Sequence, residues 1–329
     1  MFLAADIGGT KTLIALGDQA GIRFQQRILN DDHAGPTPLI AAFLRSAQEA
    51  GWPAEVEQTC LALAGPVPPG ATSAQLTNRD WLIDGAELSR TLAIGPVRLQ
   101  NDFVASAAGI STLTPAECVT LQAGEAAPAS GSRCRLVIGP GTGLGVAACL
   151  PGTGDDAGAV GIMASEAGHL GFAAAGKEQR DFLEFLAQRH GRVTVERIVS
   201  GSGLVECREF CSSNESDRTT ISPAEITRRA LAGGDPACAR ALDLFLAIFG
   251  AFAGDMALCF LSRGGVFLVG GIVPKILPRL STGPFLAAFN DKAEHAGIAA
   301  AMPIVAVLAE DLGLRGALAT ALASARTSR

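Results

Sequence analysis

A carboxylate followed by a glycine turn opens the chain: Asp6, then Gly8, Gly9, Thr10 and Lys11, between two apolar runs. The runs predict a β-hairpin, and we expect its Gly-Gly tip to need positive φ angles. Glycines without side chains let backbone N–H groups approach a phosphate, while an aspartate can face a hydrated cation. The tip is therefore either a phosphate-binding turn or an ordinary Gly-Gly hairpin.

A second turn of the same kind lies near the middle of the chain. Gly141, Thr142 and Gly143 separate two strand-like runs within residues 134–147. Two such turns, one from each half of the molecule, could offer backbone amide groups to one polyphosphate. The recurrence favours nucleotide binding over two unrelated hairpins.

Polar side chains that could pair with sugar hydroxyls follow at three further places. They are Asn101 and Asp102, then Glu166 and His169, and finally Glu196. A sugar carries several hydroxyls and no charge, so a selective site needs carboxylate, amide and imidazole groups to pair with them. Asn101 and Asp102 could instead cap a helix, and the Glu-x-x-His pair could instead bind a metal ion. The pair occurs once and no second histidine accompanies it, so we favour the sugar interpretation.

Strands and helices must position these groups, and the apolar pattern predicts both types in alternation. We expect strands over 21–29, 56–63, 97–100, 266–269 and 302–309, and helices over 38–50, 85–92, 181–190, 223–231, 236–261 and 312–325. Residues 113–133 resemble a loop between two domains, as the length of 329 residues leads us to expect. Gly270 and Gly271 end a buried strand, where they form either a tight turn or a surface for a flat base. The alternation predicts an α/β protein.

Composition excludes several classes of protein. The net charge is −6 and no long Lys/Arg run occurs, so nucleic acid is not an expected partner. We find no signal-peptide pattern and no uninterrupted apolar run of about 18 residues, which predicts a cytoplasmic protein without a membrane partner. The eight cysteines are scattered without a C-x-x-C pair. Buried free thiols are therefore expected, and Cys207 and Cys211 lack the neighbours that would complete a zinc site.

Taken together, these motifs make the chain resemble the bacterial glucokinase family, within the sugar kinase, Hsp70 and actin ATPase fold, over nearly its whole length. Residues 6–10 resemble the family's first phosphate motif, residues 139–145 its second, and residues 268–274 its adenosine motif. Residues 101–103 resemble the segment that carries the catalytic aspartate. The zinc-binding cysteine cluster of the related ROK sugar kinases and repressors is absent from the sequence.

The resemblance implies a role for each matching residue. Asp102 is the general base; the sugar contacts are Asn78, Asn101, Asp102, Glu166, His169 and Glu196; the nucleotide contacts are Asp6, Gly8, Gly9, Thr10, Lys11, Gly141, Thr142, Gly143, Gly270 and Gly271. The implied fold is two ribonuclease-H-like α/β lobes around a central cleft. These lobes are residues 1–112 plus 302–329, and residues 113–301, with the C-terminal helix returning to the first lobe. A homodimer is also implied.

The implied reaction moves a phosphoryl group from ATP to the 6-hydroxyl of glucose. Such a transfer needs in-line placement, charge neutralisation and a base near the attacking hydroxyl. Asp102 would accept the hydroxyl proton, Mg²⁺ would bridge the terminal phosphates, and Asp6 would act on the metal through coordinated water. The residues leave open glucose against mannose, fructose or glucosamine, and ATP against polyphosphate or ADP. Two rival functions are a sugar-responsive binding protein and an actin- or Hsp70-like ATPase.

Overall fold

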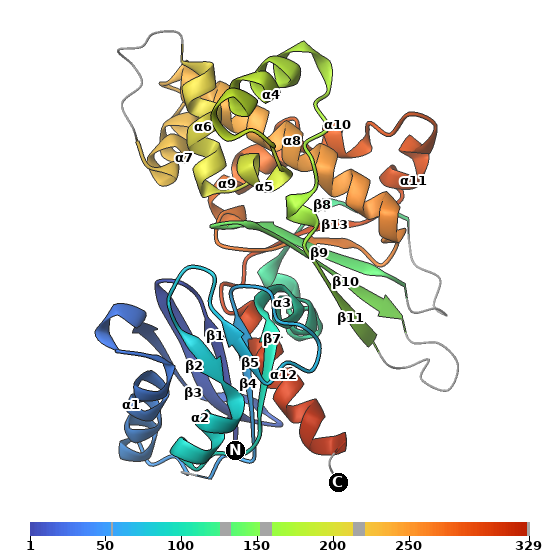
Figure 1. Ribbon diagram of the computed structural model, residues 1–329. Coiled ribbons are helices and arrows are strands. Elements are labelled where there is room, and N and C mark those ends of the chain that lie inside the picture. Colours follow the sequence, from blue (N-terminus) through green and yellow to red (C-terminus); the bar gives the residue numbers. More distant parts are fainter. Residues whose placement is uncertain (54, 126–132, 152–159, 213–220, 328–329) are drawn as a thin grey trace. The chain divides into compact units, whose positions relative to one another are not determined.

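The contacts in the computed structural model divide the chain into two compact units. Residues 1–53, 55–125, 133–151, 160–212 and 221–327 are described. Unit 1 comprises Met1–Leu113 and Ala309–Arg329, and unit 2 comprises Thr114–Leu308. Both chain ends therefore belong to unit 1 (Figure 1). Each unit is built around a sheet of its own, as expected for an α/β protein with two lobes.

Five strands form the sheet of unit 1. In spatial order they are β3 (Gly21–Leu29), β2 (Lys11–Asp18), β1 (Phe2–Ile7), β4 (Gln58–Leu63) and β7 (Val97–Asn101). The β1–β2 pair is the predicted antiparallel hairpin, whereas β1, β4 and β7 run parallel to one another. Ile7 pairs with Leu63, and Leu63 pairs with Asn101. The three parallel strands therefore end level with one another at one edge of the sheet.

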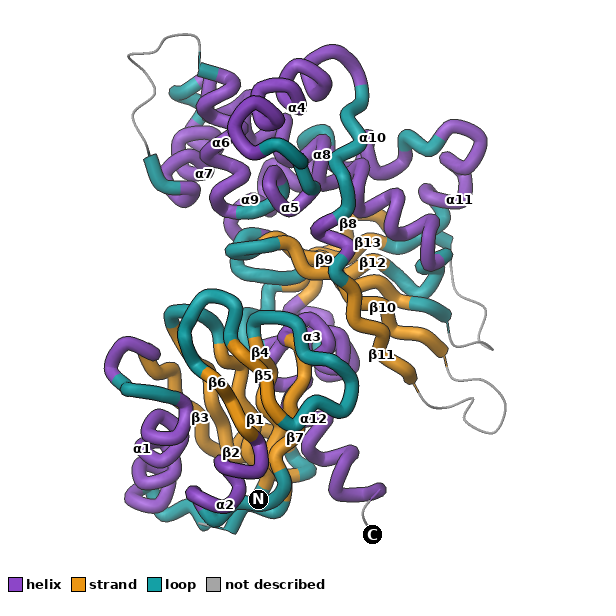
Figure 2. Tube along the Cα trace, viewed as in Figure 1, coloured by secondary structure: helices purple, strands orange, loops and turns teal. Residues whose placement is uncertain are grey.

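Helices cover both faces of this sheet (Figure 2). One face packs on α1 (Pro36–Glu49) and α2 (Gly85–Leu92), through large side chains such as Phe43. The other face packs on α3 (Asp102–Gly109) and α12 (Leu312–Thr327), through small side chains such as Ala4, Ala15 and Ala62. Side chains alternate between the faces of a strand, so β1 carries residues for both layers. A short hairpin of β5 (Ser73–Gln75) and β6 (Leu82–Asp84) completes the unit.

Backbone contact between α3 and α12 closes the second face of unit 1. A Cβ atom on Gly316 would overlap the carbonyl oxygen of Ala105, and one on Gly109 would overlap that of Leu312. The two helices therefore lie closer together than any side chain at these positions would allow. This contact returns the C-terminal helix to the first unit, as the resemblance implied.

Six strands form the sheet of unit 2. In spatial order they are β11 (Val160–Ser165), β10 (Leu144–Pro151), β9 (Arg135–Pro140), β12 (Val266–Leu268), β13 (Ile304–Val307) and β8 (Cys118–Gln122). The sequence did not predict β8 or β11. Residues 302–308, expected in the first lobe, belong to unit 2 because β13 pairs with β12 and β8.

Unit 2 also contains eight α-helices in its described part. They are α4 (Gly176–His190), α5 (Val195–Ile198), α6 (Gly201–Cys211), α7 (Pro223–Ala232), α8 (Pro236–Phe260), α9 (Val273–Thr282), α10 (Phe285–Asn290) and α11 (Ala296–Ala300). Of these helices, α8 and α9 contact the sheet. By length and composition α8 is apolar enough to cross a membrane, yet 67% of its most apolar window is buried inside the protein. Phe245 and Phe249 are fully buried there. We therefore identify α8 as the core helix of unit 2.

We predict that Gly316→Ala lowers the stability of unit 1 by about 2–3 kcal/mol, because the added methyl group forces α3 and α12 apart. Gly297→Ala is a matched control, since a Cβ on this helical glycine of α11 meets nothing within 4 Å. It should raise stability by roughly 0.5–1 kcal/mol. Calorimetric unfolding of both variants checks this, and equal effects would contradict the helix contact.

Candidate functional site

One group of predicted site residues gathers where the parallel strands of unit 1 end. The turn after β1, the loop after β4 and the start of α3 are neighbours, since Ile7, Leu63 and Asn101 are paired across the three strands. The carboxyl edge of a parallel sheet is where open α/β folds bind ligands. The strand register therefore brings Asp6 and Asp102 to the same edge.

The turn between β1 and β2 is tight, although its conformation differs from the prediction. The Gly8 N–H donates to the carbonyl of Lys11 over 3.0 Å and closes the turn. Neither Gly8 nor Gly9 has a positive φ, so that expectation is wrong. Space is the reason for glycine here: a Cβ on Gly8 would lie 3.2 Å from Lys11 O, and one on Gly9 3.2 Å from the Cβ of Asn78.

Asn30, which the sequence analysis did not identify, holds this turn from inside the unit. The residue is fully buried, and its Oδ1 accepts a hydrogen bond of 2.7 Å from the Thr12 hydroxyl. Its Nδ2 donates to the carbonyls of Gly8 (2.8 Å) and Gly9 (3.3 Å). Every polar atom of the amide thus has a partner, as burial requires. An asparagine after a strand looks like an ordinary turn residue, so no local signal marks it.

Arg79 is a second residue that the sequence analysis left without a role. Its Nε donates to the Gly9 carbonyl over 2.9 Å, and its guanidinium pairs with Asp31 and lies 4.8 Å from the centre of the Trp81 ring. Arg79 follows Asn78 directly, so its bond to Gly9 holds Asn78 against the turn.

Asn101 and Asp102 occupy the start of α3. The Oδ1 of Asn101 accepts hydrogen bonds from the N–H groups of Phe103 (2.8 Å) and Val104 (3.3 Å), which confirms the helix-capping alternative for this residue. Its Nδ2 donates one hydrogen to the Gly65 carbonyl over 2.9 Å. An amide nitrogen carries two hydrogens, so capping does not exhaust its donors. Asp102 follows at the helix N-terminus, which favours a negative charge.

A chain of contacts links α3 to the turn after β1. Gly65, whose carbonyl binds Asn101, has φ +145°, and a Cβ there would lie 2.5 Å from the Thr77 hydroxyl. The Thr77 N–H donates to the carbonyl of Ala64 over 3.2 Å. Asn78 comes next and lies against Gly9. Asn78, Asn101 and the glycine turn are thus held in one network within unit 1.

Asp6 is a desolvated carboxylate at the end of β1. Burial raises its pKa to about 6, and the Lys11 ammonium opposes part of that rise. A Cβ on Gly313 would lie 2.7 Å from Asp6 Oδ2, so the first turn of α12 approaches the carboxylate closely because it carries glycine. The helix N-terminus favours the ionised form. Asp6 therefore remains mostly ionised at neutral pH.

In unit 2, the second glycine turn lies beside the Gly270-Gly271 pair. Ile138 pairs with Leu268 across the parallel strands β9 and β12, so the segments that follow these strands are neighbours. Gly270 has φ +94°, which an L side chain rarely adopts, whereas a Cβ on the exposed Gly271 would meet nothing within 4 Å. The pair thus combines a tight turn with an open surface.

Two backbone bonds shape the Gly141–Gly143 tip itself. The Gly141 N–H donates to the Gly143 carbonyl over 2.7 Å, and the Gly201 N–H at the start of α6 donates to the Gly141 carbonyl over 2.9 Å. Thr142 is exposed at the tip. As in the first turn, neither Gly141 nor Gly143 has a positive φ.

Glu166, His169 and Glu196 come together in unit 2. His169 ends a short 3-10 turn (Ala167–His169) that Glu166 precedes, and Glu196 lies on α5. The Nε2 of His169 is 3.9 Å from Glu166 Oε2 and 3.8 Å from Glu196 Oε1. These distances exceed hydrogen-bond length, so the three side chains surround one position without direct bonds between them. Within the described ranges, no three His, Cys, Asp or Glu side chains form a group that could hold a metal ion.

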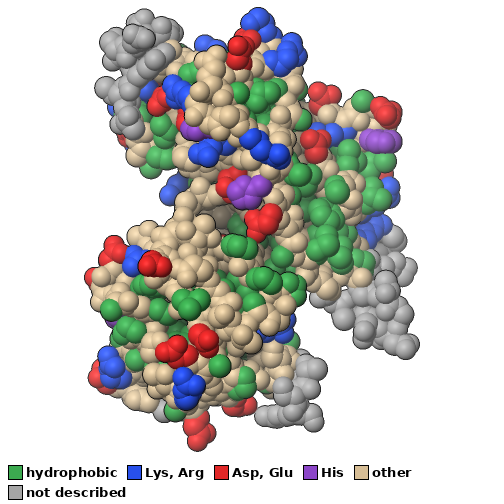
Figure 3. Space-filling model, viewed as in Figure 1, with side chains coloured by type: hydrophobic (Ala, Val, Ile, Leu, Met, Phe, Trp, Pro, Cys, Tyr) green, Lys and Arg blue, Asp and Glu red, His purple; other side chains and the backbone are tan. Residues whose placement is uncertain are grey.

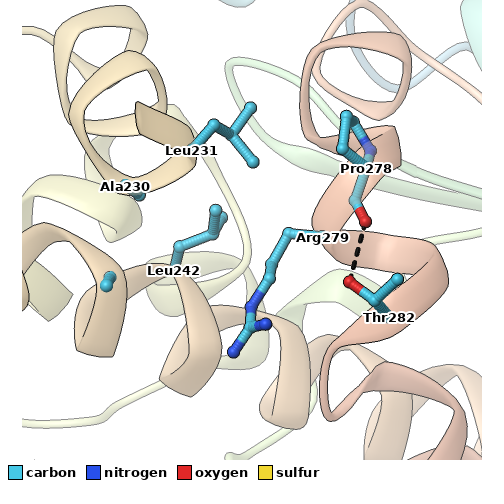
Figure 4. Close-up of a pocket in the computed structure, with 7 residues that line it drawn as sticks. Ala230, Leu231, Leu242, Pro278, Arg279 and Thr282 are labelled. Carbon is cyan, nitrogen blue, oxygen red and sulfur yellow. Dashed lines mark hydrogen bonds between the residues drawn. The ribbon is translucent and has the colours of Figure 1, made fainter. Parts of the chain in front are cut away.

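A separate hollow of about 370 Å³ lies between α7, α8 and α9 (Figure 4). Leu231, Leu242 and Pro278 contribute to its lining. Its cation, Arg279, forms two hydrogen bonds of 2.6 Å with the carboxylate of Asp243. The hollow contains none of the predicted site residues.

We predict that Asp6→Asn stabilises unit 1 at neutral pH by an amount on the order of 1–3 kcal/mol. The pKa of Asp6 is higher in the folded than in the unfolded protein, so ionisation costs stability as pH rises from the ordinary value of 3.8 to about 6. The advantage of the variant should grow over that window and then level off. Unfolding midpoints across pH check this, and a pH-independent difference would contradict it.

Asp18→Asn is the matched control on the same sheet. A hydrogen bond from Arg23 is the main reason that the pKa of Asp18 lies below its usual value, with the Ala20 N–H adding to the effect. The stability that this ionised group contributes is present above its ordinary pKa and is lost in acid, so the substitution should have the opposite sign at neutral pH.

Comparison with known proteins gives a consistent result. The glucokinase family model matches residues 3–324. A glucokinase from Synechocystis sp. is 34% identical over 98% of this chain and 98% of its own length. A glucokinase structure from an Antarctic psychrotroph is 27% identical, covers 97% of this chain and 98% of its own, and superposes with a TM-score of 0.80. A ROK-family glucokinase from Streptomyces griseus, solved with glucose and AMPPNP, shares the fold at 20% identity, with a TM-score of 0.65 over 97% of this chain and 98% of its own.

The family match spans nearly all of the chain, and the structural matches extend the likeness to both units. The protein therefore belongs to the glucokinase family.

Proposed function

We propose that this protein is a glucokinase that transfers a phosphoryl group from ATP to the 6-hydroxyl of glucose, yielding glucose 6-phosphate and ADP. One observation carries the proposal: the Glu166–His169–Glu196 cluster adjoins the second glycine turn. The N–H of Leu144, at the end of that turn, donates to Glu196 Oε2 over 2.8 Å. Side chains suited to sugar hydroxyls and a turn suited to phosphate are thus joined by a direct hydrogen bond. The matching relatives are named glucokinases, which agrees with this combination.

Nucleotide binding is assigned to the backbone of both turns. Gly8, Gly9 and Thr10 of unit 1, and Gly141, Thr142 and Gly143 of unit 2, offer a surface without bulky side chains, which suits phosphate oxygens. Lys11 adds a positive charge at the first turn. Gly271, next to Gly270, leaves an open surface that suits an adenine base.

Magnesium fits the same assignment. Burial raises the pKa of Asp6, and a neighbouring cation would favour the ionised form of this carboxylate. A single carboxylate suits an ion that keeps several waters and takes its other ligands from phosphates. When bound, Mg²⁺ would neutralise charge on the transferring phosphoryl group. Asp6 would hold coordinated water in place through its carboxylate.

Sugar binding and base catalysis are assigned to the polar residues of the two units. As the resemblance implies, Asn78 and Asn101 of unit 1 are assigned to sugar hydroxyls, and so are Glu166, His169 and Glu196 of unit 2. Asp102 accepts the proton of the 6-hydroxyl as its oxygen bonds to the γ-phosphorus and the bond to the ADP oxygen breaks. Asp102 lies at the start of α3, where the helix N-terminus favours a negative charge.

Release of ADP with and without glucose tests the function against both rivals. A glucokinase releases ADP only when sugar is present, a sugar-responsive binding protein releases none, and an actin- or Hsp70-like ATPase releases it without sugar. Mannose, fructose and glucosamine in the same assay rank the sugars. Formation of the sugar phosphate ranks polyphosphate and ADP against ATP as donors, because transfer from neither of them releases ADP.

We predict that Asp102→Asn lowers turnover by about 10²–10⁴-fold, the usual contribution of a general base, while glucose affinity stays within a few fold. Asparagine keeps the side-chain shape and the acceptor for the Phe103 N–H but cannot accept a proton. Asp84→Asn is the control, because Asp84 also sits at a helix start in unit 1, where it caps α2 through the Glu87 N–H. Turnover near wild type in the Asp102 variant would remove that residue from its role.

The resemblance also supports a cytoplasmic homodimer without nucleic-acid or membrane partners. On the face shown in Figure 3, acidic and basic side chains are interspersed. Light scattering is expected to give twice the chain mass of 33.6 kDa, and a mass equal to one chain would refute the dimer.

A further inference from the structure

The two carboxylates beside His169 differ in their other contacts. Glu166 has a side chain that is 66% exposed, whereas that of Glu196 is 31% exposed and lies against the second glycine turn. Glu196 Oε2 accepts the Leu144 N–H over 2.8 Å, and Oε1 faces His169. One carboxylate therefore divides its two oxygens between the turn and the sugar cluster.

Glycine at position 143 is required by this arrangement. A Cβ there would lie 2.5 Å from Glu196 Oε2 and 3.1 Å from its carboxyl carbon, so any side chain would displace the carboxylate. A Cβ on Gly141, in the same turn, would meet nothing within 4 Å. Neither glycine has a positive φ, so the difference between them lies in the space around Cβ rather than in backbone strain.

The segment that carries Glu166 and His169 also contacts the second glycine turn. A Cβ on Gly168, between Glu166 and His169 in the chain, would overlap the carbonyl oxygen of Leu144. Leu144 is thus held on two sides. Its N–H binds Glu196, and its carbonyl packs on the turn that carries His169. A shift of the glycine turn would therefore move both Glu196 and the segment that carries Glu166 and His169.

We propose that Glu196 is shared by the sugar and phosphate sites, so that Gly143 and Leu144 position the sugar carboxylate, and hexose binding and phosphate binding are coupled within unit 2. The inference rests on the proposed function and adds to it that one hydrogen bond carries the coupling. A hexose that holds Glu196 in place also holds the turn in its phosphate-binding shape. By linkage, a nucleotide that orders the turn strengthens hexose binding by the same factor.

The first test measures glucose binding without nucleotide, by calorimetry. Gly143→Ala is expected to weaken binding at least tenfold, although position 143 is not a sugar contact, while Gly141→Ala stays within about twofold of wild type. Equal affinities in the two variants would overturn the proposal. Wild-type protein that binds no glucose would instead refute the proposed function, so the two failures are distinguishable.

The second test measures binding of AMPPNP with Mg²⁺ in the absence of sugar. Glu196→Ala is expected to weaken it about tenfold, whereas Glu166→Ala, which removes the other carboxylate beside His169, leaves it unchanged. Glu196→Gln keeps an oxygen that can accept the Leu144 N–H, so it should restore nucleotide binding while glucose binding stays weak. Identical nucleotide affinities in all three variants would overturn the coupling, and this outcome does not depend on how Gly143→Ala folds.

Discussion

The register of the parallel strands is the constraint on which the rest of the structure depends. In unit 1 the pairing of Ile7, Leu63 and Asn101 makes three strands end level. In unit 2 the pairing of Ile138 with Leu268 makes the segments that follow β9 and β12 neighbours. Every assigned phosphate or base contact follows one of these strand ends directly or lies within one turn of it. Because side chains alternate along a strand, a slip of one residue would reverse the faces and separate these loops.

Glycine acts in this protein mainly as a spacer. Gly8, Gly9 and Gly143 have ordinary φ angles, and what they provide is room for a carbonyl, an asparagine and a carboxylate. Gly313 and Gly316 do the same for α12, which reaches Asp6 and the backbone of α3. The two glycine turns, the surroundings of Asp6 and the contact between α3 and α12 thus share one feature: the absence of a Cβ atom lets the backbone approach closely.

The buried or partly buried polar groups of unit 1 serve different purposes. Asn30 is fully hydrogen-bonded and fixes the first turn, while Asn101 caps α3 and anchors Gly65. Asp6 is the exception, because burial raises its pKa and its ionised form costs stability at neutral pH. Strained electrostatics of this kind are common at functional sites, where a ligand charge offsets them.

Features that depend on neighbouring residues in the chain could be predicted from the amino-acid sequence. Among these are the β1–β2 hairpin, the two glycine tips, the cap at Asn101 and the apolar stripe of α8, because turn chemistry and periodicity are local. Tertiary structure alone decided the rest. The strand β8, the place of residues 302–308 and the turn-holding role of Asn30 arise from contacts between segments far apart in the sequence. The strand β11 pairs with β10, the strand before it in the chain, although the apolar pattern did not predict it. The pKa of Asp6 and the bond from Leu144 to Glu196 likewise depend on burial and on contacts that no local pattern encodes.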